Sequence, residues 1–318
     1  MWVPNEGEYV TAQGTANLDT GREREPDDPF RIASITKTFT ATAILQLVDK
    51  GRLSKSDKLS TWYPDFPNAD KITVDDLLRM RSGIVDPFED KDFLQYYYDN
   101  PEANITAEDS IEASAAKADE FEPPDQKTDY NNLNFILLQE IVRKVSGNDL
   151  GVQVAQNIFE PLGMENSLYP ANDQLPGELR GYALDPETEQ FEDKTILNPA
   201  VPGGAGAIIS DLSDLRTYAR ALCAGDLLQP DAQQVRLEAE QMDDEPDFIQ
   251  YGEGVVLLGK FCGHNGTIFG FSSEMFYLPE EDAIIVVNVN RLDADDESKS
   301  TDLFLAISKT LFPEHVDW

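Results

Sequence analysis

The chain has 318 residues, of which 25 are Lys or Arg and 60 are Asp or Glu, so its formal net charge is −35. A surface this acidic repels nucleic acid and anionic membranes, and neither is expected as a partner. The acidic residues are spread along the chain, which favours an acidic surface suited to high salt over a disordered tail; an acidic protein of ordinary habitat is the alternative.

Targeting and metal signals are weak. The longest apolar runs, such as 283–289, have the length of a strand, and the start MWVPNEGEYV lacks the regions of a secretion signal. We therefore expect a soluble protein without membrane insertion, either cytoplasmic or secreted with its signal removed. Two cysteines, Cys223 and Cys262, make no disulfide framework, and their oxidation state stays open. With only two histidines, no zinc site is expected, and the acidic segment 293–304 is interpreted as a solvated loop because it lacks the Gly and Glu of a calcium loop.

The elements in the first half of the chain begin with strand material at 8–18. A helix is predicted over 35–50, because apolar residues recur at helical spacing and Gly51 follows its end. Two more helices are predicted to begin after the capping-box patterns Thr73–Asp76 and Thr106–Asp109.

The second half opens with a strongly apolar helix predicted over 132–146 and another over 211–223. Residues 252–290 are typical of strands joined by short turns, and a last helix is predicted over 299–311. The pattern predicts an α+β fold in which both ends form one antiparallel sheet flanked by helices. We expect 1–51 and 226–318 to form this sheet lobe, 52–225 to form a mostly helical lobe, and the active site to lie in the cleft between them.

Ser34 and Lys37 stand three residues apart at the start of the first helix, so their side chains share one face. A serine hydroxyl becomes a nucleophile when a base takes its proton, and a lysine can be that base if burial lowers its pKa. Apolar neighbours favour such burial. The same pattern recurs at Ser114 and Lys117, but there the surroundings are acidic and we expect a solvent-facing, protonated lysine.

Two further stretches carry candidate site residues. Tyr130 and Asn132 lie just before the 132–146 helix, where they could bind a substrate or simply cap the helix. His264 lies on a predicted strand with Gly263 and Gly266 beside it; it is either a site residue or an ordinary core histidine. A dyad of Cys262 with His264 is disfavoured because no basic neighbour lowers the thiol pKa.

Together these motifs resemble those of the serine hydrolases that include class C β-lactamases, penicillin-binding D-alanyl-D-alanine carboxypeptidases, D-aminopeptidases and related esterases. Their signatures Ser-x-x-Lys, Tyr-x-Asn and Lys/His-x-Gly match Ser34–Lys37, Tyr130–Asn132 and His264–Gly266 in order. The stretches 72–84, 158–167 and 203–210 agree with the family as well. The resemblance implies a β-lactamase/transpeptidase-like fold, with no metal and no cofactor.

The resemblance also implies a role for each residue. Ser34 would be acylated, Lys37 would help to activate it, and Tyr130 would act as base and then acid, with a pKa lowered by Lys37. Asn132 would hold Lys37 and the substrate, the strand of His264 and Gly266 would line the cleft, and the backbone N–H groups of Ser34 and Thr267 would form the oxyanion hole.

The implied reaction is cleavage of an amide or ester bond in a small molecule or peptide. Histidine in place of lysine at position 264 removes a permanent cation that would bind a β-lactam carboxylate, which favours a peptidase or esterase over an efficient β-lactamase. Alternatives are a binding or sensor module that is acylated without turnover, and a purely structural acidic protein. The substrate's identity and the oligomeric state stay open.

Overall fold

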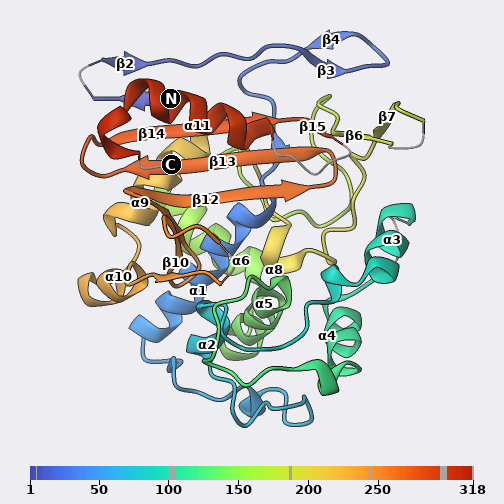
Figure 1. The fold of residues 1–318 in the computed structure, drawn as a ribbon, viewed down its shortest axis with the longest axis vertical. Coiled ribbons are helices and arrows are strands. Elements are labelled where there is room, and N and C mark those ends of the chain that lie inside the picture. Colours follow the sequence, from blue (N-terminus) through green and yellow to red (C-terminus); the bar gives the residue numbers. More distant parts are fainter. Residues whose placement is uncertain are drawn as a thin grey trace.

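The central feature is an eight-stranded antiparallel sheet whose strand order is β2-β1-β14-β13-β12-β11-β10-β9. The computed structural model describes residues 1–4, 6–100, 103, 105–185, 188–243, 245–293 and 299–316. Strands from the two ends of the chain lie side by side, since Trp2 of β1 pairs with Ile284 of β14. Figure 1 shows this sheet in the upper half of the molecule, with the amino and carboxyl ends both beside it.

The strands of the described residues are β1 (Trp2–Val3), β2 (Gly7–Glu8), β3 (Thr15–Asn17), β4 (Arg22–Glu23), β5 (Phe30–Arg31), β6 (Tyr182–Leu184), β7 (Phe191–Asp193), β8 (Ile209–Ser210), β9 (Glu240–Gln241), β10 (Ile249–Tyr251), β11 (Val256–Leu258), β12 (Phe261–Ile268), β13 (Phe271–Leu278), β14 (Ala283–Val289) and β15 (Arg291–Leu292). The α-helices are α1 (Thr36–Asp49), α2 (Val74–Leu78), α3 (Lys91–Asp99), α4 (Ala107–Ala115), α5 (Asn132–Ser146), α6 (Leu150–Val154), α7 (Glu160–Leu162), α8 (Gly203–Gly206), α9 (Leu212–Ala224), α10 (Pro230–Arg236) and α11 (Lys299–Leu311).

Helices cover both faces of the sheet. Helix α11 packs on β13 and β14, where Phe304 contacts the rings of Phe261 and Phe276. Helix α9 contacts the same two strands and β12. Alternate residues of β12 face these two layers, so His264 and Gly266 share a face with Cys262, and Asn265 lies on the other.

Helix α1 links the sheet to the helical part of the molecule. Most of its side chains are buried, as expected of a central helix, and it packs against α5 and α8. Helix α5 in turn contacts α2 and α4, and these helices lie below the sheet in Figure 1. The division into a sheet lobe and a helical lobe stays a proposal. Helix α9 packs on the sheet and would belong to the sheet lobe, although it lies within residues 52–225 of the expected helical lobe.

The α+β class with an antiparallel sheet and flanking helices is confirmed. Helix α5 has the predicted bounds, with Asn131 capping its start and Gly147 in the left-handed conformation (φ 80°) after its end. Both capping boxes are present, at Thr73–Asp76 and Thr106–Asp109. The strand material expected over 8–18 is confirmed only in part: the segment holds the end of β2 and the short β3, which pairs with β4 rather than with the eight-stranded sheet. In the acidic segment 293–304, residues 294–298 lie outside the described part, and α11 begins at Lys299.

Candidate active site

Ser34 occupies a sharp corner between β5 and α1. It is the middle residue of a 3₁₀ helix (Ala33–Ile35) that leads into α1, and its side chain is half-buried. The preceding residue, Ala33, has φ 50°, a left-handed conformation that costs a residue with a Cβ about 1 kcal/mol or more. Backbone strain of this kind is often found at functional sites, and here it lies directly before Ser34.

Lys37 is fully buried one turn after Ser34. Its Nζ lies 2.9 Å from the Ser34 Oγ, 2.8 Å from the Asn132 Oδ1 and 3.1 Å from the Ala205 carbonyl oxygen. Burial in surroundings of low dielectric constant lowers the Lys37 pKa to about 7, and Asp86 opposes this shift. A lysine with such a pKa is half neutral near pH 7, and its neutral amine can accept the proton of a neighbouring hydroxyl.

Asn132 is held in place by Asp86, a residue that the sequence reasoning missed. The buried Asp86 carboxylate accepts hydrogen bonds from the Asn132 backbone N (2.7 Å) and Nδ2 (2.9 Å). Since Nδ2 donates to Asp86, the Asn132 Oδ1 is the atom that faces Lys37. Burial raises the Asp86 pKa. One acidic residue among 60 carries no sequence signal of its own, and only the fold separates Asp86 from the others.

Tyr130 completes the group around Lys37, with its ring centroid 4.7 Å from the Lys37 Nζ. Burial raises the Tyr130 pKa above its ordinary value, although a side-chain hydrogen bond with Ser34 opposes the shift. This differs from the lowered pKa that the family resemblance implied. The reason is that desolvation of the phenolate dominates, and the negative charge of Asp86 raises the Tyr130 pKa further.

His264 is buried on β12, with its ring 6.2 Å from that of Tyr130 and 5.9 Å from that of Tyr251. Its Nδ1 lies 2.6 Å from the Asn265 carbonyl oxygen. Burial and the nearby Lys37 lower the His264 pKa to about 3. At neutral pH the imidazole is therefore uncharged. It can contribute a hydrogen bond to the site, but not a positive charge.

Gly266 allows β12 to approach the nucleophile closely. A Cβ at this position would lie 2.3 Å from the Ile32 carbonyl oxygen and 2.9 Å from the Ser34 backbone N, so any side chain would push the strand away. The next residue, Thr267, lines the same pocket as Ser34. The structure thus brings Ser34, Lys37, Tyr130, Asn132, His264, Gly266 and Thr267 to one place.

A pocket of about 220 Å³ opens beside Ser34, and no charged side chain is among its described lining residues. Its walls come from the segment 85–105, from residues 202–206, and from the end of β12 with the turn that follows it. The larger apolar and aromatic side chains that line it are Phe88, Leu94, Tyr97, Ile268, Phe269 and Leu292.

The Beta-lactamase family model matches residues 1–307 of the chain. The chain belongs to the Beta-lactamase family. Among its relatives, Penicillin-binding protein 4* of Bacillus subtilis is 26% identical over 91% of this chain and 67% of its own length. PbpX of the same organism is 28% identical over 85% of this chain, which spans only 64% of PbpX.

Two solved structures share the fold at a TM-score of 0.82. A D-stereospecific amidohydrolase from Streptomyces sp. is 29% identical, with a TM-score of 0.82 over 92% of this chain and 89% of its own. A penicillin-binding protein from Bacillus halodurans is also 29% identical, with a TM-score of 0.82 over 95% of this chain and 91% of its own. Membership in the Beta-lactamase family and these neighbours support a serine hydrolase, and they confirm the family and the fold expected from the three motifs.

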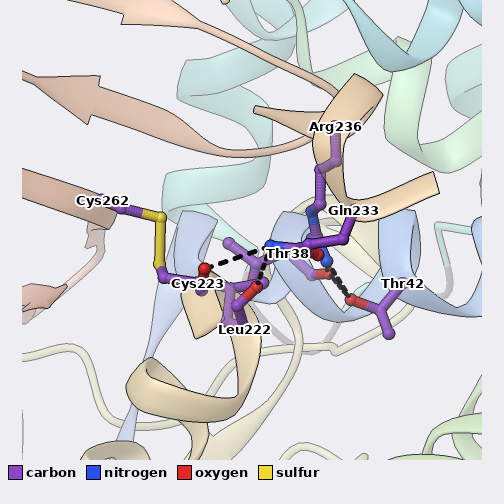
Figure 2. Close-up of a disulfide and its surroundings, with 7 residues drawn as sticks. All are labelled: Thr38, Thr42, Leu222, Cys223, Gln233, Arg236 and Cys262. Atoms are coloured by element: carbon purple, nitrogen blue, oxygen red, sulfur yellow. Dashed lines mark hydrogen bonds between the residues drawn. A yellow bond between two sulfur atoms is a disulfide. The ribbon is translucent and has the colours of Figure 1, made fainter. Parts of the chain in front are cut away.

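A disulfide joins Cys223 of α9 to Cys262 of β12, two residues before His264 (Figure 2). Beside it, Gln233 of α10 donates to the carbonyl oxygens of Leu222 and Cys223. Arg236, the last residue of α10, donates to the Thr42 Oγ1 and the Thr38 carbonyl oxygen of α1. The disulfide ties β12, which carries His264, to α9, and the hydrogen bonds of α10 connect α9 to α1, which carries Lys37. The disulfide also rules out a free Cys262 thiol in a dyad with His264.

Neither a metal site nor a membrane span is found in the described part of the chain. No cluster of three His, Cys, Asp or Glu side chains there could hold a metal ion. Likewise, none of the helices in those residues has both the length and the apolar character needed to cross a bilayer.

Proposed function

We propose that this chain is a serine hydrolase that cleaves amide or ester bonds through an acyl-enzyme on Ser34. The observation that carries the proposal is the contact of a buried, half-neutral lysine with the serine: the Lys37 Nζ lies 2.9 Å from the Ser34 Oγ, and the Lys37 pKa is lowered to about 7. A nucleophile within hydrogen-bond reach of a base is what covalent catalysis requires.

In the first half-reaction, the neutral Lys37 amine takes the hydroxyl proton as the Ser34 Oγ bonds to the substrate's carbonyl carbon. The carbonyl oxygen becomes an anion that the backbone N–H groups of Ser34 and Thr267 would stabilise; one such donor contributes about 3–4 kcal/mol. The carbon–heteroatom bond then breaks. The leaving group takes the hydroxyl proton of Tyr130, and the Lys37 ammonium returns a proton to Tyr130.

In the second half-reaction, water attacks the acyl carbon and the proton path runs in reverse. This assignment makes Lys37 the base at neutral pH and Tyr130 a proton carrier, because the Tyr130 pKa is raised and its phenolate is scarce. His264 and Gly266 would lie on the strand that lines the substrate cleft, β12. Asn132 would hold Lys37 and the acyl side of the substrate.

The pocket beside Ser34 favours an acyl group with an apolar side chain, because no charged residue is among its described lining residues and aromatic and aliphatic side chains form its walls. Substrates of the D-amino-acid amide or short ester type fit this chemistry, in agreement with the D-stereospecific amidohydrolase among the neighbours. Weak β-lactamase activity is compatible with the same acyl-enzyme.

The direct test is intact-mass detection of covalent adducts with penicillin, short p-nitrophenyl esters and D-amino-acid amides, with Ser34→Ala as the control. We expect an adduct of one acyl group on Ser34 and a burst of p-nitrophenol, followed by turnover. A Ser34→Ala variant that retains full turnover would exclude the proposal. Stable labelling by a β-lactam without turnover of any probe would instead indicate the binding or sensor module.

We also propose that the acidic surface is adapted to high salt, because a net charge of −35 on a folded chain causes strong self-repulsion that salt screens. The midpoint of thermal unfolding should therefore rise as KCl is added over the molar range. A flat or falling midpoint contradicts this adaptation and leaves the catalytic proposal untouched.

A further inference from the structure

The pocket beside Ser34 lies between two walls. One wall is the end of β12, and the other includes Leu94 and Tyr97 of α3. Strand β12 meets the backbone of Ser34 at Gly266. Successive residues of a strand advance about 3.3 Å, so Phe269, three residues after Gly266, lies about 10 Å from this point.

Phe269 connects the two walls. It belongs to the turn between β12 and β13, yet its ring centroid lies 5.2 Å from that of Tyr97 and 5.0 Å from that of Tyr98, both on α3. Figure 1 shows this turn and α3 on the same side of the molecule. Phe269 also lines the pocket, so its ring closes the pocket where the two walls meet.

The turn that carries Phe269 is fixed in position. Gly270 has φ 79°, and a Cβ on it would lie 2.5 Å from the carbonyl carbon of Gly181, so the two backbones are in close contact. The Gly181 backbone N donates to the Thr195 Oγ1 at 2.9 Å, and its carbonyl oxygen accepts from the Lys194 backbone N at 2.8 Å. The turn therefore rests on a hydrogen-bonded segment.

Helix α3 is held against Phe269 by a small hydrophobic cluster that is separate from the main core. The Asn198 Nδ2 donates to the carbonyl oxygens of Ala103 and Ile105, at 2.6 and 3.0 Å. These bonds tie the chain after α3 to the segment that supplies the rest of the cluster. Its buried members are Tyr97, Ile105, Leu197 and Val201, and Phe269 packs against them. A change at Phe269 thus alters the pocket without reaching the main core.

The size of the pocket sets a limit on what it can hold. A cavity of about 150 Å³ holds one benzene molecule, so about 220 Å³ has room for a compact side chain of roughly that size. A long linear acyl chain would meet the Phe269 ring or turn out into solvent. Its last methylene groups would then gain no apolar contacts in the pocket.

We infer that Phe269 is a specificity-determining residue: its ring closes the pocket against α3 and limits the length of the acyl group that Ser34 takes up. The inference rests on the proposed function. Short or compact acyl groups would be good substrates, and long linear ones would be poor. Since each methylene group that a pocket buries raises kcat/KM about fourfold, removal of the ring should favour long chains.

The p-nitrophenyl esters of butanoic and octanoic acid test this limit, because they differ only in chain length. In the parent chain we expect kcat/KM for the octanoyl ester to be no greater than that for the butanoyl ester. Phe269→Ala opens the end of the pocket, so the octanoyl-to-butanoyl ratio should rise at least tenfold. Phe269→Leu keeps part of the side chain and should give an intermediate ratio.

Phe191→Ala is the matched control. Phe191 of β7 is an aromatic residue outside the pocket, with its ring centroid 5.0 Å from the Arg291 guanidinium carbon. The ratio in this variant should stay within twofold of that of the parent chain. Because the readout is a ratio of two rates on one enzyme preparation, inactive protein in a variant preparation cancels.

Three results would overturn the inference alone, provided that the butanoyl ester still gives a burst. They are a parent chain that prefers the octanoyl ester, a ratio that both Phe269 variants leave unchanged, and an equal rise in Phe191→Ala. Absence of a burst with either ester, and of any adduct on Ser34, would overturn the proposed function and the inference with it.

Discussion

Two Ser-x-x-Lys pairs in this molecule share a sequence pattern and differ in everything around it. In the first pair, Lys37 is fully buried, contacts the Ser34 Oγ, and has a lowered pKa. In the second pair, Lys117 forms an ion pair with Asp90, and that hydrogen bond raises its pKa. The Ser114 hydroxyl donates to the Val85 carbonyl oxygen at 2.6 Å.

Burial of the lysine, and a hydroxyl whose proton the lysine can take, therefore separate a catalytic arrangement from a structural one. The expectation that Lys117 is protonated agrees with its raised pKa, but Ser114 beside it is buried rather than solvent-facing. Its neighbours along the chain looked polar, yet α4 turns this serine towards the segment that contains Val85 and Asp86. The segment of Val85 and Asp86 thus contacts the surroundings of both pairs. The Val85 carbonyl oxygen accepts from Ser114, and the Asp86 carboxylate accepts from Asn132, which contacts Lys37.

The largest expected difference between the two pairs is in acylation. Ser34→Ala should abolish the covalent adduct and lower kcat/KM at least about 10⁴-fold, because it removes the nucleophile. Ser114→Ala, the matched control in the second pair, should leave kcat/KM within about twofold. Burst kinetics with a p-nitrophenyl ester measure both, and a comparable loss in the two variants would remove the distinction between the pairs.

The next effect concerns the base. Since the Lys37 pKa is lowered to about 7, the active neutral amine disappears as the pH falls below that value, and kcat/KM should decline about tenfold per pH unit on the acid side. Above pH 7 the rate should level off. Lys37→Arg keeps the charge but offers no base, so a loss of roughly 10²–10⁴-fold is expected. A profile that is flat from pH 5 to 8 would exclude Lys37 as the titrating base.

A smaller effect is expected from Asp86→Asn, which keeps the shape of the side chain and removes its charge. The Asp86 carboxylate raises the Lys37 pKa, so its neutralisation should move the acid limb of the kcat/KM profile to lower pH. Weaker support of Asn132 should also lower the plateau, by about tenfold. Asp90→Asn, in the second pair, is the control and should move neither; a limb that stays in place in Asp86→Asn contradicts the coupling of Asp86 to Lys37.

The smallest effect is expected from Lys117→Gln. This lysine and Asp90 are solvent-accessible, and exposed ion pairs contribute little to folding. The p-nitrophenyl ester assay should give kcat/KM within about twofold of the parent chain, and the acid limb should not move. A large loss of activity would show that the second pair has a part in the reaction.

The sequence predicted the elements whose signals are local. Helix α5 has its cap, its apolar face and its terminal glycine within one stretch, and the motifs around Ser34, Tyr130 and His264 are equally local. What escaped depends on contacts between distant segments. Cys223 and Cys262 are 39 residues apart and show no spacing that reveals their bridge, and the raised Tyr130 pKa follows from burial that only the assembled fold defines.

The left-handed Ala33 has a consequence for anyone who wishes to stabilise this enzyme. Glycine adopts φ 50° without the penalty that a Cβ brings, so Ala33→Gly would relieve strain at the corner before Ser34 but would also loosen the unfolded chain. Alanine at this position restricts the backbone that carries the Ser34 hydroxyl, and it lowers the free energy of unfolding. Substitutions that stabilise the protein elsewhere, for example on its acidic surface, would leave the backbone conformation of Ala33 unchanged, and with it the rate of acylation at Ser34.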